Sequence, residues 1–171
     1  MTDPRQGDAL LRTVARLPCG AGIVFRHREL AAGERRALFD RVRRMARARG
    51  LMLVLAGPER QARAWGADGA HGWDRGPRVA AAGFLRSRPC HDAAQVRAAR
   101  TAGVALLFVS PVYPTRSHPG TAALGLAGLL RLTRGRRGDV VALGGMTPRR
   151  ARGLARVGMA RWAAIDGLTR G

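Results

Sequence analysis

The chain contains no lysine and no asparagine, and all 31 of its basic residues are arginine. The shortage of residue types with A/T-rich codons indicates a genome-composition bias, so the arginine count alone is a poor functional signal. The 31 basic residues still face only 11 acidic ones, which leaves a formal net charge of +20 at pH 7. Such a charge favours nucleic acid, an anionic membrane or phosphorylated small molecules as partners, although a solvated arginine-rich surface explains it as well.

Aromatic residues are also scarce, at 5% of the chain. They do not interleave with arginine, as a platform for stacking bases requires. The scarcity of aromatic residues disfavours a nucleic-acid partner. An interaction protein whose positive surface binds nucleic acid stays an alternative. The expected partners are phosphorylated small molecules, and the sequence leaves the oligomeric state open.

The chain also has only two cysteines and no long apolar run. Cys19 and Cys90 are far apart and form no CxxC pair, which is typical of a reduced intracellular protein rather than a disulfide scaffold. The longest apolar runs, such as 51–56, are too short to span a bilayer. The first residues, MTDPRQGD, lack the apolar region of a signal peptide. We therefore expect a cytoplasmic protein with no membrane partner.

Short apolar runs alternate with amphipathic stretches along the chain. Strands are expected at 21–25, 51–56, 68–70, 80–85, 104–109, 139–143 and 161–165. Helices are expected at 34–49, before Gly66, from Asp92 to Gly103, from Thr121, and from Thr147-Pro148 to Gly158. Seven strands with intervening helices predict a parallel sheet.

The alternation predicts one domain over residues 1–171, an α/β fold of the (β/α)₈ TIM-barrel type. A complete barrel usually needs roughly 200 residues or more. We therefore expect a trimmed barrel with a missing or vestigial first strand and a short C-terminal end. A doubly wound sheet is the second choice, because no GxGxxG follows the first strand.

Two strand-end loops carry the groups that a phosphate needs. The loop SPVYPTRSHPG (110–120) offers the hydroxyls of Thr115 and Ser117, and Gly144-Gly145 follow the next strand and precede a capped helix. Glycines let backbone N–H groups approach an anion, and a helix N-terminus adds a favourable dipole. Because parallel α/β proteins bind substrates where strands end, the two loops suggest one site. Asp166-Gly167 follow the last strand as a further candidate loop. The alternative interpretation of Gly144-Gly145 is a tight turn that binds nothing, and that of the 110–120 loop is a rigid surface loop.

Arg26 and Arg28 come at the end of the first expected strand, where alternation points both to the same side. If that side is the barrel interior, the two cations require an anionic partner such as a diphosphate. If they lie past the strand, they are solvated arginines. His71 and His91 are interpreted as structural histidines at strand ends rather than acid–base catalysts, and no zinc-like spacing occurs.

Four motifs in order resemble the thiamine phosphate synthase and thiazole tautomerase family: GADGAH (66–71), the 110–120 loop, VALGGMTP (141–148) and WAAIDG (162–167). The resemblance implies a (β/α)₈ barrel. The family's synthases join an aminopyrimidine, delivered as its diphosphate, to a thiazole phosphate, releasing pyrophosphate with the help of Mg²⁺.

The resemblance also assigns roles to single positions. Val24, Arg26 and Arg28 fall on the family's diphosphate-binding Q-x-R-x-K strand, so the Gln is lost and Arg replaces Lys. This makes Arg26 and Arg28 the catalytic candidates. Thr115 and Ser117 match the hydroxyls that hold the thiazole phosphate, and His118 stands at the position of a family Lys.

The remaining substrate-binding positions lie near the end of the chain. Gly144 and Gly145 match the family's phosphate-binding glycines. Ile165 and Gly167 keep their places, whereas Asp166 replaces a family Ser and would repel phosphate unless it turns away or pairs with Arg.

The family's metal ligands are largely missing. Its Asn-Asp pair falls on Ala56-Gly57, and Asp74 is the remaining candidate for the second metal ligand. One carboxylate holds Mg²⁺ only if the substrate diphosphate supplies most ligands. Arginines are an alternative means of stabilising the departing pyrophosphate.

The sequence therefore predicts a thiamine phosphate synthase-like transferase of thiamine biosynthesis. A degenerate member is the first alternative, acting as a thiazole tautomerase or as a non-catalytic binder of thiamine phosphate or thiazole phosphate. The tautomerase's catalytic His is replaced by Ser110-Pro111. A basic protein that interacts with nucleic acid is the second alternative.

Overall fold

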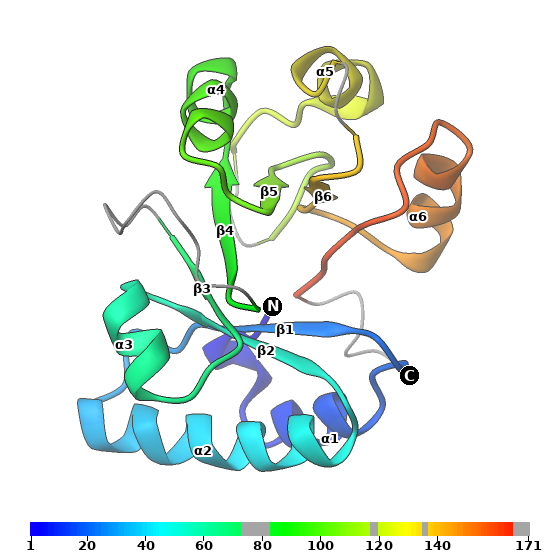
Figure 1. Cartoon of the computed structure of the whole chain (residues 1–171). Coiled ribbons are helices and arrows are strands. Elements are labelled where there is room, and N and C mark those ends of the chain that lie inside the picture. Colours follow the sequence, from blue (N-terminus) through cyan, green and yellow to red (C-terminus); the bar gives the residue numbers. More distant parts are fainter. Residues whose placement is uncertain (73–82, 117–119, 135–136, 166–171) are drawn as a thin grey trace. The chain divides into compact units, whose positions relative to one another are not determined.

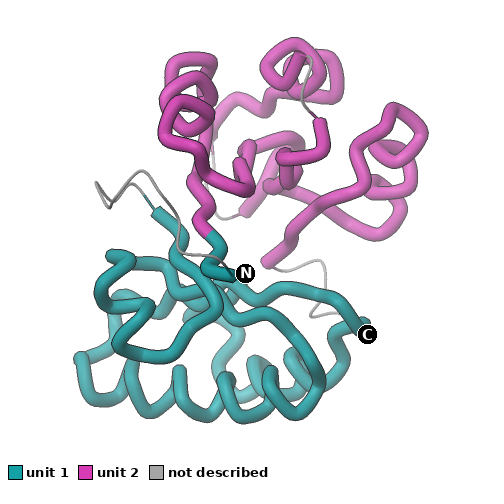
Figure 2. Tube along the Cα trace, in the orientation of Figure 1, with its two compact units in different colours: residues 1–85, 171 teal, residues 86–170 magenta. Residues whose placement is uncertain are grey.

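The structure is a computed structural model that describes residues 1–72, 83–116, 120–134 and 137–165. The chain divides into two compact units, which we call unit 1 (residues 1–85) and unit 2 (residues 86–170) (Figure 2). Strands alternate with helices in both units (Figure 1).

Unit 1 contains three parallel strands and the helices that follow them. Its elements are η1 (Pro4–Gln6), α1 (Ala9–Ala15), β1 (Gly22–Phe25), α2 (Ala32–Ala48), β2 (Met52–Ala56), α3 (Glu59–Ala64) and β3 (Gly69–His71). Phe25 pairs with Leu55, and Ala56 pairs with His71. The carboxyl ends of β1, β2 and β3 therefore meet at one edge of the sheet.

The core of unit 1 forms because β1 and β2 are continuous apolar runs. Every residue of these strands after the first is buried, as is usual for parallel strands covered on both faces. Helix α2 packs Phe39, Val42 and Ala46 against them, at the spacing of one helical face. Figure 1 shows α2 running along the β1–β2 layer.

The first residues lie beside β1. The Thr2 N–H donates to the Val24 carbonyl at 2.9 Å, and the Thr2 hydroxyl accepts from the Arg26 N–H at 2.9 Å. These contacts tie the start of the chain to the end of β1 without making a strand.

Unit 2 repeats the pattern. It contains β4 (Leu85–Cys90, whose first residue belongs to unit 1), α4 (Ala93–Thr101), β5 (Leu106–Val109), α5 (Gly125–Leu132), β6 (Val140–Ala142) and α6 (Pro148–Ala155). Strands β4 and β5 pair in parallel, as do β5 and β6. Leu107, Val109 and Val140 form the core with side chains from the helices.

The predicted helix starts at Asp92 and Thr147 are confirmed. The Asp92 carboxylate accepts the Gln95 N–H at 2.8 Å, and the Thr147 hydroxyl accepts the Arg150 N–H at 3.3 Å. Pro148 occupies the first turn of α6, where its missing N–H costs nothing.

Two predicted boundaries are wrong. Helix α5 begins at Gly125 rather than Thr121, because the N–H groups of Leu124 and Gly125 bond to the carbonyls of Pro111 and Val112 in a loop. The strand expected at 80–85 overlaps β4 only at Leu85, because β4 spans Leu85–Cys90; residues 80–82 lie outside the described ranges. The sequence of β4, LRSRPC, has too few apolar residues to be recognised as a strand.

The expectation of seven strands is also wrong. The described residues form six strands, and the seventh is reduced to a bridge between Ala142 and Trp162. The fold is therefore α/β with parallel strands, but it lacks the eight strands of a complete barrel in the described ranges. The expectation of a single domain stays a prediction. Within the same ranges, no helix has the length and apolar character needed to cross a membrane.

Candidate functional site

The first group of candidate residues lies at the carboxyl ends of β1, β2 and β3 in unit 1. Strand β1 ends at Phe25, so Arg26 and Arg28 both lie in the loop past the strand. His27, between them, has φ of +40°, which breaks the strand alternation expected to orient the two arginines alike. Arg26 is half-buried and Arg28 is exposed.

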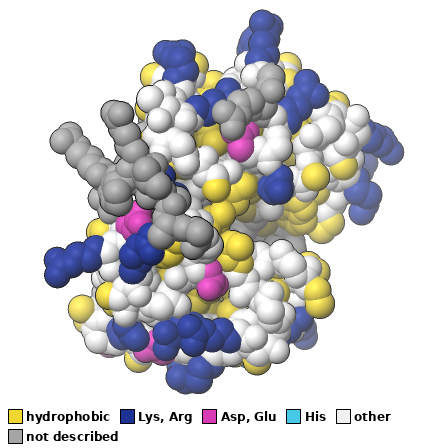
Figure 3. Space-filling view, viewed as in Figure 1, with side chains coloured by type: hydrophobic (Ala, Val, Ile, Leu, Met, Phe, Trp, Pro, Cys, Tyr) yellow, Lys and Arg dark blue, Asp and Glu magenta, His cyan; other side chains and the backbone are white. Residues whose placement is uncertain are grey.

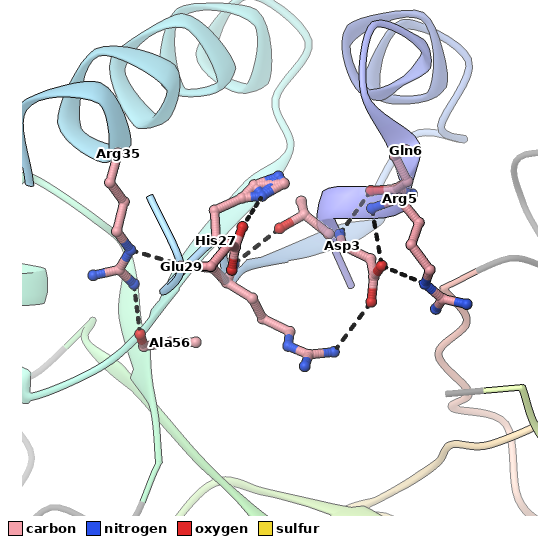
Figure 4. Close-up of polar contacts among 9 residues, drawn as sticks. Asp3, Arg5, Gln6, His27, Glu29, Arg35 and Ala56 are labelled. Atoms are coloured by element: carbon pink, nitrogen blue, oxygen red, sulfur yellow. Dashed lines mark hydrogen bonds and ion pairs between the residues drawn. The ribbon is translucent and has the colours of Figure 1, made fainter. Parts of the chain in front are cut away.

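Arg26 is held through both its backbone and its side chain. Its N–H donates to the Thr2 hydroxyl, and its carbonyl accepts from Arg35 Nε at 3.0 Å. Its Nη1 lies 3.8 Å from Asp3 Oδ2. A hydrogen bond from Arg5, 2.6 Å from Asp3 Oδ1, is the largest cause of the lowered pKa of Asp3 (Figure 4).

Arg35 joins two strand ends and was missed by sequence reasoning. Figure 4 shows it reaching from α2 toward Ala56. Its Nε donates to the Arg26 carbonyl, and its Nη2 donates to the Ala56 carbonyl at 2.8 Å. The guanidinium also lies 5.3 Å from the ring centroid of Trp65. Arg35 is only 8% exposed, and burial, followed by the charge of Arg28, lowers its pKa.

The signal for Arg35 was present in the sequence. It lies four residues before Phe39 and seven before Val42, on the helix face that turns to the core. An arginine is almost never buried without partners, so its place on this face indicated a bonded side chain.

Two histidines are buried at these strand ends. His71 is 6% exposed, and its pKa is lowered to about 4 by burial, then by the charges of Arg28 and Arg26. It is therefore neutral at pH 7. His27 is 3% exposed with a pKa lowered mainly by burial, and neither ring nitrogen has a hydrogen-bond partner among the described residues. Glu29 Oε1 lies 3.9 Å from its Nδ1.

The described residues at the end of β2 do not fit a magnesium site. Ala56 and Gly57 have no side-chain oxygen, and the Ala56 carbonyl already accepts from Arg35 and, at 3.4 Å, from Arg28 Nε. No cluster of three potential His, Cys, Asp or Glu ligands occurs in the described part of the chain. Asp74, the proposed metal ligand, lies outside that part.

The second group of candidates lies at the carboxyl ends of β5 and β6 in unit 2. Gly144 and Gly145 have φ of +92° and +61°, in the region that favours glycine. A Cβ on Gly144 would lie 2.7 Å from Pro111 Cα, and one on Gly145 would lie 2.5 Å from the Pro114 carbonyl oxygen. Both positions therefore require glycine.

The same glycines join the two loops that the sequence predicted to share a site. The Val112 N–H donates to the Leu143 carbonyl at 2.8 Å, and the Tyr113 N–H donates to the Gly144 carbonyl at 3.1 Å. The expected proximity of the loops after β5 and β6 is thus confirmed. The amino end of α6 follows directly after Gly145, Met146 and the capping Thr147.

The other predicted residues of this group are only partly described. Thr115 is half-buried in the loop after β5, and Ile165 is half-buried past Trp162. Ser117, His118, Asp166 and Gly167 lie outside the described ranges. Arg150, which the sequence analysis did not select, stacks on the Tyr113 ring at 4.4 Å and donates to the Gly145 carbonyl.

His91 lies at the junction of β4 and α4, as expected of it, and its structural role stays a prediction. It is exposed, follows β4, and its Nδ1 lies 2.8 Å from the carbonyl oxygen of Ser110 at the end of β5. A carbonyl oxygen only accepts, so Nδ1 carries the proton. Neutral His91 then keeps a lone pair on Nε2, as a proton acceptor requires.

Arginine is not confined to these strand ends. Figure 3 shows basic side chains over both units on the visible face, with few acidic ones between them. Other arginines, such as Arg43 and Arg49, also donate to backbone carbonyls. Arg28 and Arg35 at the strand ends are distinguished because both donate to one carbonyl, that of Ala56.

A family model and a curated relative both place the chain among proteins of thiamine phosphate synthesis. The thiamine monophosphate synthase family matches residues 2–168 of the chain. The thiamine biosynthesis bifunctional protein ThiM/ThiE of Symbiobacterium thermophilum is 32% identical over 174 aligned residues. That match covers 98% of this chain but only 35% of the relative, so the chain spans about a third of its length.

Solved structures show a similar fold. The thiamine phosphate pyrophosphorylase of Pyrococcus furiosus has a TM-score of 0.80 and 21% identity, covering 99% of this chain and 85% of that one. The thiamine phosphate pyrophosphorylase of Bacteroides thetaiotaomicron has a TM-score of 0.62 and 17% identity, covering 95% and 80% respectively. At these identities the likeness concerns the fold alone.

Proposed function

Because this chain belongs to the thiamine monophosphate synthase family, we propose that it is a thiamine phosphate synthase-like transferase. It joins an aminopyrimidine diphosphate to a thiazole phosphate and releases pyrophosphate. The observation that carries the proposal is the pairing of the loops after β5 and β6 around Gly144 and Gly145. We further propose a trimmed (β/α)₈ barrel. The two free cysteines, Cys19 and Cys90, support a cytoplasmic location.

The loops after β5 and β6 bind the thiazole phosphate. Backbone N–H groups at Gly144 and Gly145, with the amino end of α6 behind them, attract the anion. The Thr115 and Ser117 hydroxyls donate further hydrogen bonds, and His118, Ile165, Asp166 and Gly167 complete the predicted substrate-binding set. Contact between the two loops supports this assignment, because it holds the glycine backbone in place before the ligand arrives.

Arg26 and Arg28 bind the aminopyrimidine diphosphate. The C–O bond between the pyrimidine's methylene carbon and the diphosphate breaks, and its electron pair leaves on the pyrophosphate. The thiazole nitrogen then donates its lone pair to the methylene carbon and forms the new C–N bond. Cationic groups near the departing oxygens stabilise the negative charge that develops on the pyrophosphate. This stabilisation is the protein's main contribution to lowering the reaction barrier.

The proposal is tested by incubating the purified protein with both substrates and measuring thiamine phosphate by mass spectrometry. We expect thiamine phosphate and pyrophosphate in equal amounts. A folded protein that binds thiazole phosphate and forms no thiamine phosphate would leave only the binding role.

His91 favours one second candidate, thiazole tautomerisation. Moving a proton between two positions of a ring requires a group that removes it and returns it. His91 is oriented by the Ser110 carbonyl, and its Nε2 lone pair is available for that step. The His91→Gln variant tests the candidate. Loss of tautomerase turnover with unchanged thiamine phosphate formation would assign the histidine to the second activity.

A further inference from the structure

We propose that arginine guanidinium groups at the ends of β1 and β2 hold the diphosphate in place of a divalent cation. The inference rests on the proposed function and concerns how its diphosphate is neutralised. Arg26 and Arg28 contact the ligand, and Arg35 is the positioning residue that holds them.

The first argument is the chemistry of the position itself. A divalent cation there needs oxygen ligands, and magnesium demands near-octahedral geometry around them. Ala56 and Gly57 offer only backbone, and the Gly57 N–H is bonded to the His71 carbonyl at 3.1 Å. The Ala56 carbonyl is engaged by two guanidinium groups, from Arg35 at 2.8 Å and Arg28 at 3.4 Å. The side chains of Arg28 and Arg35 therefore already place positive charge at the end of β2.

The second argument is the balance of charge. The guanidinium groups of Arg28 and Arg35 meet at the Ala56 carbonyl, at the end of β2, and that of Arg26 extends from the end of β1 toward Asp3. Two carboxylates oppose these three arginines. Asp3 is shared between Arg5 at 2.6 Å and Arg26 at 3.8 Å, and Glu29 lies in the exposed loop. The nearby His71 is neutral, because burial and the charges of Arg28 and Arg26 lower its pKa to about 4. The surplus is positive, so an anion is the ligand that relieves it.

The third argument is the availability of donors. Arg28 uses only Nε in a hydrogen bond within the described ranges, so its two terminal nitrogens remain for a ligand. A guanidinium presents its N–H groups in a planar fork that matches phosphate oxygens, and such charge-assisted bonds are strong. Arg35 is different, since its Nε and Nη2 are committed to backbone carbonyls and it is buried. It fixes the loop from which Arg26 and Arg28 project.

The bonds formed and broken in the reaction are the same when arginine side chains take the place of a divalent cation. The electron pair of the broken C–O bond leaves on pyrophosphate, and no proton is needed if the guanidinium groups neutralise the oxygens. The arginines cannot lose their own protons under working conditions, so their charge is constant through the step.

The experiment measures the binding of inorganic pyrophosphate to the whole chain by calorimetry, in EDTA and in Mg²⁺ at constant ionic strength. We expect binding in EDTA, and Arg28→Ala to raise Kd about tenfold there. The matched control is Arg44→Ala, which removes the same charge from an exposed position on α2 and leaves Kd unchanged. Arg28→Lys keeps the charge without the fork and gives an intermediate Kd. Thermal unfolding verifies that each variant is folded.

Binding that requires Mg²⁺, or an equal loss in Arg28→Ala and Arg44→Ala, overturns the inference. Thiamine phosphate formation separates this failure from failure of the proposed function. Product formed only with Mg²⁺ overturns the inference and leaves the function standing. Pyrophosphate bound in EDTA without any product supports the arginine site and overturns the synthase assignment.

Discussion

The strand ends of unit 1 are organised by side chains, whereas those of unit 2 are organised by backbone. In unit 1, Arg35 bonds the carbonyls of Arg26 and Ala56. In unit 2, glycines allow two loops to approach until Val112 and Tyr113 bond the carbonyls of Leu143 and Gly144. Under the proposed function, the diphosphate that leaves would meet arginine side chains, and the thiazole phosphate would meet backbone N–H groups.

The largest expected effect is the loss of Arg35. Arg35→Met keeps the apolar stem but removes the donor to the Arg26 carbonyl and leaves the Ala56 carbonyl with only the 3.4 Å bond from Arg28. We expect this to cost about 3 kcal/mol of unfolding free energy. Urea denaturation measures this value. Arg36→Met is the control, since Arg36 makes a surface pair with Asp40 on the same helix and should lose less than about 1 kcal/mol. Equal losses of unfolding free energy in the two variants would mean that the stability of unit 1 does not depend on the Arg35 bonds.

The glycine arrangement of unit 2 is tested by Gly144→Ala. A methyl group there meets the Pro111 backbone at 2.7 Å, and φ of +92° is strained for alanine, so we expect a loss of about 2 kcal/mol. The control is Gly153→Ala on α6, where a Cβ meets nothing within 4 Å. Alanine should be neutral or stabilising there, because the position is helical. A Gly144→Ala protein as stable as the parent would contradict the close contact of the loops.

The pH dependence of stability tests the strand ends of unit 1, because burial, followed by the charges of Arg28 and Arg26, lowers the pKa of His71. Its folded pKa of about 4 lies below the ordinary value of 6.5, so the unfolded chain binds a proton first as the pH falls. The His71 contribution to stability is full above pH 6.5 and is lost toward pH 4, by about 2 kcal/mol between pH 7 and 5. The Met1 amino group, whose pKa burial lowers to about 5, adds a loss of the same sign that begins below pH 8.

Denaturation at several pH values measures this slope. His27 and Asp3 also have lowered pKa values and add to it with the same sign, Asp3 at lower pH. The His71→Gln variant isolates the His71 contribution by flattening the curve. A variant as steep as the parent would show that His71 is not the titrating group.

The smallest expected effect is on ligand binding in unit 2. Thr115→Val removes one hydroxyl and should raise the KM for thiazole phosphate about tenfold, with little change in the KM for the aminopyrimidine diphosphate. Thr101→Val, at the end of α4, is the matched control. Steady-state kinetics with each substrate varied in turn distinguishes the two. A shift in both KM values would remove the separation of roles between the two sets of strand ends.

Sequence reasoning succeeded where the interaction partners are close in the chain. The caps at Asp92 and Thr147 each bond an N–H three residues away. It also predicted the meeting of the loops after β5 and β6, because neighbouring parallel strands must end at the same edge. It failed for β4, whose sequence LRSRPC has few apolar residues although the strand pairs in parallel with β5.

The contacts of Arg35, which sequence reasoning missed, and of His91, whose partner it did not identify, span longer separations. Arg35 bonds a carbonyl 21 residues away, and His91 contacts a carbonyl 19 residues away. No periodicity specifies either partner, since the carbonyl group is the same in every residue.

The strands of unit 1 and the helix caps could be predicted from the amino-acid sequence, because each depends on the conformational preference of a few adjacent residues. Two contacts could not: the Ala56 carbonyl accepts from two guanidinium groups, and His91 lies against the Ser110 carbonyl. Such contacts arise when strands far apart in the chain pair in register, and the pairing brings together whatever groups happen to follow each strand.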